Sequence, residues 1–225
     1  MINIQNLSKS FGKQLVLNNI NIEYKDNGIY GLVGFNGAGK TTFFKCIMGL
    51  LQHEGSIAYN KELNIGYLPT DMFMYPKITG LEYIEFCMSA RKISFDKTAL
   101  TDWNKLMQLP LDKYAQDYST GMKKKLALLA IILQSNDILI LDEPFNGLDL
   151  TTNLFLVDIL QEMKKAGKII LISSHILQTL KDICDSIEVL DNRNISHYNK
   201  KQYSELDDYF KDKRKGLINI SLLHI

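Results

Sequence analysis

Apolar and polar positions divide the first third of the chain into short strand-like segments. Period-two alternation and apolar runs predict β-strands at 2–7, 20–24 and 28–33, and two more at 55–59 and 63–68. A glycine-rich turn after the third segment leads into a helix that starts near residue 40. The chain therefore opens with a sheet-rich region.

Beyond residue 70 the pattern becomes helical and then alternates. Apolar residues recur at helical spacing over 81–88 and 100–107, which predicts an inserted helical subdomain. Further along, helical and strand-like patterns take turns at 120–133, 137–141, 150–165, 168–172 and 176–183. Such alternation predicts an α/β fold with a mostly parallel sheet covered by helices.

Composition and charge exclude some classes of function without choosing one. The 225 residues, 46% of them hydrophobic and 23% charged, are typical of one globular domain. With 26 basic and 25 acidic side chains, the formal charge of +1 gives no overall attraction to nucleic acid. The apolar runs are shorter than the roughly 20 residues of a membrane-spanning helix, and the start lacks a signal-peptide pattern. We expect a cytoplasmic chain that does not span a membrane.

A phosphate-binding loop follows the strand predicted at 28–33. The sequence GFNGAGKTT at 34–42 fits the G-x-x-x-x-G-K-[ST] spacing. The glycines let successive backbone N–H groups converge on phosphate oxygens, Lys40 brings a positive charge, and the Thr41 hydroxyl can bind Mg²⁺. We therefore predict a nucleoside triphosphate site made by Gly34, Asn36, Gly37, Ala38, Gly39, Lys40, Thr41 and Thr42.

Two adjacent carboxylates close the strand predicted at 137–141. Parallel strands end at the same edge of a sheet, so Asp142 and Glu143 are expected to meet the phosphate loop. Asp142 would then bind Mg²⁺, and Glu143 would activate the attacking water. Acidic residues at a strand end are by themselves more often part of a turn or a helix cap. The phosphate loop makes the catalytic interpretation the better one.

These motifs together resemble the nucleotide-binding cassette of the ATP-binding cassette (ABC) transporter family, over about residues 1–190. The segment 8–12 resembles the family's adenine-stacking loop, with Phe11 as the aromatic residue. The YSTGM sequence at 118–122 resembles the signature that caps the γ-phosphate on an opposing subunit. Three lysines at 123–125 crowd the start of the following helix, which also favours an anion site. The residues implied for the signature are Ser119, Thr120, Gly121 and Met122.

Two further segments match the family and one departs from it. The NGLD sequence ending at Asp149 resembles the D-loop, and His175 resembles the switch histidine that contacts the γ-phosphate. Thr70 stands where the family usually has a glutamine that contacts Mg²⁺ and water. Our hypothesis is that the shorter Thr70 side chain reaches the metal only through water, which weakens coupling to membrane subunits.

The resemblance implies a fold, a set of subdomains and an activity. The fold is a P-loop NTPase with helices on both faces of the sheet and an N-terminal antiparallel β subdomain. The core would comprise 1–70 and 134–190, the helical subdomain 71–133, and a C-terminal tail 191–225. Within the tail, the mixed-charge run 207–215 is interpreted as a solvated helix face or a linker, and the apolar stretch 217–225 follows it.

The function implied is that of an ATP-hydrolysing subunit of a transporter, with ATP and Mg²⁺ as cofactors. Its partners would be a second cassette, identical or related, and separate integral membrane permease subunits at the cytoplasmic face, with export the favoured direction. One alternative is an ABC-type ATPase acting on ribosomes or nucleic acid, although such members usually carry two cassettes or a long coiled coil. Another is a regulatory cassette with impaired hydrolysis, which Thr70 favours and Glu143 and His175 oppose.

Overall fold

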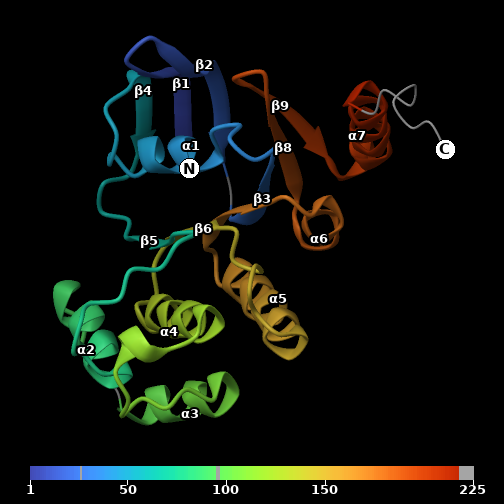
Figure 1. The fold of residues 1–225 in the computed structure, drawn as a ribbon. Coiled ribbons are helices and arrows are strands. Elements are labelled where there is room, and N and C mark those ends of the chain that lie inside the picture. The colour runs from blue at the N-terminus through green and yellow to red at the C-terminus, as the bar shows by residue number, and fades with distance from the viewer. Residues whose placement is uncertain (26, 95–96, 218–225) are drawn as a thin grey trace.

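The computed structural model describes residues 1–25, 27–94 and 97–217. Its larger sheet has the strand order β5-β6-β7-β3-β8-β9 (Figure 1). These strands are β3 (Gly28–Val33), β5 (Ile65–Leu68), β6 (Ile138–Asp142), β7 (Ile169–Ser174), β8 (Ser186–Asp191) and β9 (Asn194–Asn199). All neighbouring pairs are parallel except β8 and β9, which are antiparallel. The predicted α/β fold with a mostly parallel sheet is confirmed.

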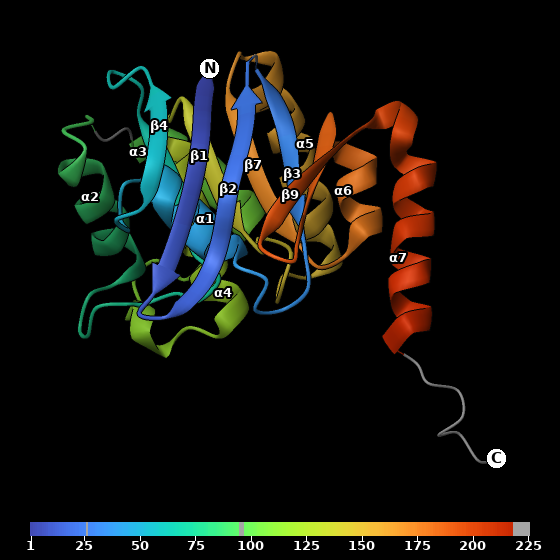
Figure 2. The same cartoon turned by 90° about the horizontal axis from the view of Figure 1, so that it is seen from above.

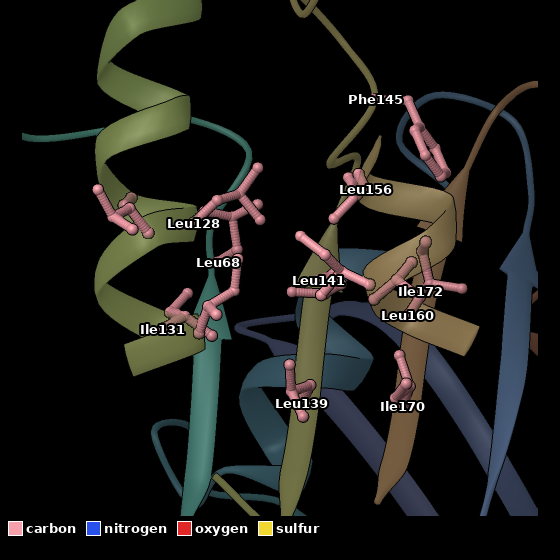
Figure 3. Close-up of a cluster of buried hydrophobic side chains, with 14 of the residues drawn as sticks. Leu68, Leu128, Ile131, Leu139, Leu141, Phe145, Leu156, Leu160, Ile170 and Ile172 are labelled. Atoms are coloured by element: carbon pink, nitrogen blue, oxygen red, sulfur yellow. The ribbon is translucent and has the colours of Figure 1, made fainter. Parts of the chain in front are cut away.

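The parallel strands are covered on both sides, which explains their sequence. Every residue of β6 and β7 is buried, so 138–141 and 169–172 read as continuous apolar runs without alternation before the polar strand ends. Figure 3 shows Leu139 and Leu141 of β6 beside Ile170 and Ile172 of β7, all facing helices. The helices on this face are α4 (Thr120–Leu133) and α5 (Leu150–Lys165).

A three-stranded antiparallel sheet lies across the other side of the molecule (Figure 2). It has the order β2-β1-β4 and consists of β1 (Ile2–Phe11), β2 (Gln14–Tyr24) and β4 (Glu54–Tyr59). Helix α1 (Lys40–Ile47) lies between the two sheets, and its Phe43, Phe44 and Ile47 join one buried cluster with side chains of both. This packing fixes the helix that follows the phosphate loop.

Helices α2 (Gly80–Ala90), α3 (Lys97–Met107) and α4 lie together below the sheet edge at β5 (Figure 1). Helix α2 begins with a capping box in which Thr79 and Glu82 satisfy each other's backbone N–H groups. Arg91, just after α2, donates to the Asn136 side chain over 2.7 Å and to the Ile65 backbone. The inserted helices are therefore joined to the sheet by polar contacts as well as by apolar packing.

The chain after residue 183 contains elements that the pattern did not predict. Helix α6 (Leu177–Ile183) is followed by the β8–β9 hairpin, whose turn has Asn192 and Arg193 at φ 47° and 70°. Helix α7 (Tyr203–Leu217) then packs beside β9, and its charged run belongs to this helix. Part of the apolar stretch predicted at 217–225 lies outside the described residues. Within the described ranges, no helix combines the length and hydropathy needed to cross a bilayer.

Candidate active site

A cleft of about 370 Å³ lies at the carboxyl ends of β3 and β6. It brings together most of the site predicted from the sequence, which is assembled from the phosphate loop, the start of α1 and the end of β6. The lining residues are Val16, Asn36, Gly37, Ala38, Gly39, Lys40, Thr41, Thr42, Thr70, Asp142 and Glu143. Segments separated by about a hundred positions in the sequence thus share one cavity, as the parallel-sheet argument requires.

The phosphate loop has a shape that its glycines make accessible. Gly37 and Gly39 have φ of 80° and 110°, which side-chain-bearing residues rarely adopt. A Cβ on Gly39 would stand 2.9 Å from the Val16 side chain, whereas one on Gly37 would meet nothing within 4 Å. Gly39 is therefore required by packing as well as by conformation, while Gly37 is favoured by conformation alone.

Lys40 lies at the first position of α1 and is 8% exposed. Its ammonium donates to the Gly34 carbonyl over 2.8 Å, so the lysine joins the end of the loop to its first residue. The same atom lies 3.5 Å from Glu143 Oε1. The backbone N–H groups that open α1 have no partner inside the helix, and together with this ammonium they make the cleft floor attractive to an anion.

Asp142 is the most deeply buried carboxylate of the cleft, with 1% exposure. Its Oδ2 accepts from the Thr41 hydroxyl and its Oδ1 from the Ser173 hydroxyl, both over 2.5 Å. Thr41 and Asp142 thus present hydroxyl and carboxylate oxygens side by side, a donor set that suits a hard cation bound largely through phosphate and water. These residues fit Mg²⁺. Ser173 did not emerge from the sequence, because serine in a buried strand carries no signal of its partner.

Glu143 leaves the strand with φ 52°, in the left-handed region. Its Oε2 accepts from Nδ1 of His175 over 2.9 Å and from the His175 backbone N–H over 3.3 Å. The backbone N–H of Glu143 donates to Ser173 Oγ over 2.9 Å. The predicted base and the predicted switch histidine are therefore adjacent, although His175 does not itself line the cleft.

Thr70 lines the cleft, and its hydroxyl points to the strand that ends in the carboxylates. The contact is a long one of 3.5 Å to the backbone carbonyl of Asp142. No contact between Thr70 and a side-chain oxygen of Asp142 or Glu143 occurs in the described structure. This geometry is compatible with a metal contact through water, which stays a hypothesis.

Phe11 does not line the cleft. It is the last residue of β1, beside the hairpin turn, and its side chain is about half exposed with the Lys9 ammonium 4.7 Å from its ring centre. The segment 8–12 is thus mostly strand, whereas the sequence suggested a loop after residue 7. Val16, on the neighbouring strand, is the residue from this sheet that borders the cleft. An adenine contact of Phe11 remains a prediction.

The signature residues lie together with the D-loop, away from the cleft of their own chain. Ser119 caps α4 by accepting from the Met122 backbone N–H, and Thr120 begins the helix. A Cβ on Gly121 would stand 2.5 Å from the Gly147 carbonyl, so the two segments touch closely. The predicted signature and D-loop residues therefore form one surface, and their role toward a nucleotide stays a prediction.

The lysines after the signature require a correction. We interpreted all three as an arrangement that meets an external anion, but two of them bind groups of their own chain. Lys124 is 2% exposed and donates to backbone carbonyls, and Lys125 forms a 2.7 Å ion pair with Asp149. That ion pair and the N-cap contact with Thr152 hold the pKa of Asp149 far below its usual range. These contacts fix the Asp149 side chain at the start of α5.

Comparison with known proteins decides the family. A family model described as ABC transporter matches residues 17–146, which include the phosphate loop, the signature segment and both carboxylates. The chain belongs to the ABC transporter family. A second model, described as an AAA domain, putative AbiEii toxin, Type IV TA system, matches residues 111–215 of this ABC protein.

Curated relatives agree with this assignment over nearly the whole chain. An uncharacterized ABC transporter ATP-binding protein of Methanocaldococcus jannaschii is 32% identical, covering 88% of this ABC protein and 77% of the relative. The lantibiotic transport ATP-binding protein SrtF of Streptococcus pyogenes is 35% identical, with 83% and 85% covered. The ABC-type transporter ATP-binding protein EcsA of Bacillus subtilis is 30% identical, with 99% and 95% covered.

A solved structure described as the ATP-binding subunit of an ABC transporter superposes with a TM-score of 0.84. It is 26% identical in sequence, and the match covers 94% of this ABC protein and 98% of that chain. The likeness therefore includes the inserted helices and the elements around the C-terminal helix as well as the central sheet. The P-loop NTPase fold expected from the sequence is confirmed.

Proposed function

We propose that this chain binds Mg-ATP in the cleft and hydrolyses it to ADP and phosphate. The observation that carries the proposal is the meeting of Lys40, Thr41, Asp142 and Glu143 in one cavity whose floor is the start of α1. Each of these groups has the chemistry that phosphoryl transfer needs, and family membership supports the same reaction.

Each residue of the cleft has a proposed role that follows from its position. The loop amides and Lys40 bind the β- and γ-phosphates, since they form the positive end of the cleft. Thr41 and Asp142 would hold Mg²⁺, which would neutralise charge on the phosphate oxygens. Glu143 accepts a proton from the attacking water, and His175, 2.9 Å from the Glu143 carboxylate, orients this base. Hydrolysis thus depends on Glu143, and binding depends on Lys40.

We further propose that two cassettes work together. Ser119, Thr120, Gly121 and Met122, together with Asp149, would face the ATP held by Lys40 of the opposing copy, because they lie outside the cleft of their own chain. The second cassette is either identical or a related subunit. Closure over two ATP molecules would then bring a signature segment to each γ-phosphate.

The names of the relatives support a transport role. One relative is named as a lantibiotic transport ATP-binding protein and another as an ABC-type transporter ATP-binding protein, while a third is named as a linearmycin resistance ATP-binding protein. We propose that this chain drives export through separate membrane permease subunits, at the cytoplasmic face of the membrane. The distances in the cleft concern hydrolysis alone, so this step rests on the similarity to those proteins.

The test compares the purified chain with Glu143→Gln and Lys40→Ala. We expect Mg-dependent ATP turnover in the parent, turnover reduced by roughly a hundredfold or more with ATP binding retained in Glu143→Gln, and loss of binding in Lys40→Ala. Glu205→Gln, an exposed change on α7, is the matched control and should behave as the parent. ATP binding and turnover in Lys40→Ala equal to the parent would refute the assignment of the cleft.

A second experiment addresses the partners. The Glu143→Gln chain with ATP is expected to form a closed dimer, measurable by light scattering, and to be recovered with membrane subunits from detergent-solubilised membranes. Recovery with ribosomes or DNA would favour the alternative of an ABC-type ATPase acting there. Absence of any turnover in the parent chain, with ATP binding intact, would favour a regulatory cassette.

A further inference from the structure

Lys124 is a buried cation that none of the motifs explains. It lies in the second turn of α4 with 2% exposure, and its ammonium donates to the backbone carbonyls of Glu143 and Asn146, each over 2.8 Å. Burial lowers its pKa, and the nearby charges of Glu143, Asp142 and Asp71 partly oppose that effect. The side chain therefore spans from the signature helix to the loop that carries the catalytic base.

The burial of the Lys124 ammonium costs free energy, so its presence needs an explanation. Removing a lysine from water costs several kcal/mol, and an apolar side chain of similar length would fill the same space at lower cost. Two carbonyl contacts recover part of that cost, and both lie in the turn between β6 and α5. The Lys124 ammonium therefore holds the 143–146 turn together, because it binds the carbonyls of the turn's first and fourth residues.

The turn held by Lys124 has a demanding conformation. Glu143 is in the left-handed region, a strained conformation for a side-chain-bearing residue that persists only where surrounding contacts impose it. Ser173 fixes the Glu143 N–H and Lys124 fixes the Glu143 C=O, so the backbone of this residue is bound at both ends. From this fixed backbone the Glu143 carboxylate reaches Lys40 Nζ at 3.5 Å and His175 Nδ1 at 2.9 Å.

We propose that Lys124 is a positioning residue for hydrolysis, because it fixes the 143–146 turn and thereby aims the Glu143 carboxylate. It acts from the helix whose N-cap is Ser119, so the signature end and the base are joined by one side chain. A shift of α4 relative to the sheet would move the Glu143 carbonyl directly. This role rests on the proposed ATP hydrolysis.

The test uses Lys124→Met, which keeps the length of the side chain and removes the charge and the donors. Turnover at saturating Mg-ATP should fall about tenfold to a hundredfold, while KM changes less than about threefold, because the loop that binds phosphate is untouched. Lys124→Gln, which keeps one donor group, should recover part of the turnover. If Lys124→Met does not fold, Lys124→Gln compared with the parent gives the same separation of kcat from KM.

The control is Lys164→Met, which breaks a 2.5 Å ion pair with Asp185 away from the cleft. It should lower the melting temperature without changing kcat. A Lys124 variant with parental kcat, or one in which kcat and stability change only as in Lys164→Met, would overturn the proposal. Failure of the proposed hydrolysis is distinguishable, because the parent itself would then show no turnover.

Discussion

Replacing Ser173 by alanine removes one oxygen that serves both carboxylate residues of the cleft. Ser173 is fully buried, donates to Asp142 Oδ1 and accepts from the Glu143 N–H. Alanine would leave a carboxylate oxygen and a backbone amide without this partner at a fully buried position. Each such orphaned group costs about 1–3 kcal/mol, so the unfolding free energy should fall by about 2–6 kcal/mol.

That loss is large against the roughly 5–15 kcal/mol of a typical domain. Urea unfolding followed by fluorescence measures it: with a slope of about 2–3 kcal/mol per molar, the midpoint should drop by about 0.7–3 M. Turnover should fall as well, since Asp142 and Glu143 both lose an orienting bond. Ser174→Ala is the neighbouring control, because Ser174 Oγ accepts a single bond, from the Ile176 N–H. A Ser173→Ala midpoint equal to that of the parent would contradict this account.

Three other changes test separate parts of the structure. Gly39→Ala should weaken ATP binding at least tenfold, because φ 110° and a contact of 2.9 Å with Val16 both oppose a Cβ; isothermal titration measures it, and parental affinity would contradict the packing argument. The hydrogen bond that His197 donates to the Glu188 carboxylate raises the pKa of His197 above its usual value, so this stabilisation is complete below about pH 6.5 and is lost as pH rises through the folded pKa. Denaturation between pH 6 and 8 should therefore show a flatter stability profile in His197→Gln, and an unchanged slope would exclude this pair as its source. Thr70→Gln should raise ATP turnover with permease present, and equal rates would end the hypothesis of weakened coupling.

What the sequence could predict depends on how local each signal is. The phosphate loop is contiguous, and Asp142 with Glu143 closes a strand whose apolar run is unmistakable, so their meeting followed from parallel topology alone. Ser173 lies 31 positions from Asp142, and its part in the site depends on the register of β6 with β7. No spacing rule within one strand conveys such a pairing.

The C-terminal elements were missed for related reasons. The β8–β9 hairpin turns through Asn192 and Arg193 at positive φ, without the glycine that normally announces such a turn. The first strand continues to Phe11 through register shifts that break its alternation after residue 7. The sequence does not distinguish Lys124, because three consecutive lysines look like one charged surface. Only the packing of α4 on the sheet shows that Lys124 is buried and its neighbours are not.

The left-handed backbone at Glu143 gives two consecutive carboxylates different neighbours in one cleft. In an ordinary extended strand, adjacent side chains project to opposite faces, which would send one of this acidic pair away from the cavity. The positive φ at Glu143 instead keeps its carboxylate on the same side as that of Asp142, where the two carboxylates contact different residues. A β-branched residue at 143 should therefore reduce activity for two reasons: it lacks the carboxylate, and it disfavours the left-handed backbone. Asparagine tolerates that backbone, so it should reduce activity only through the missing carboxylate.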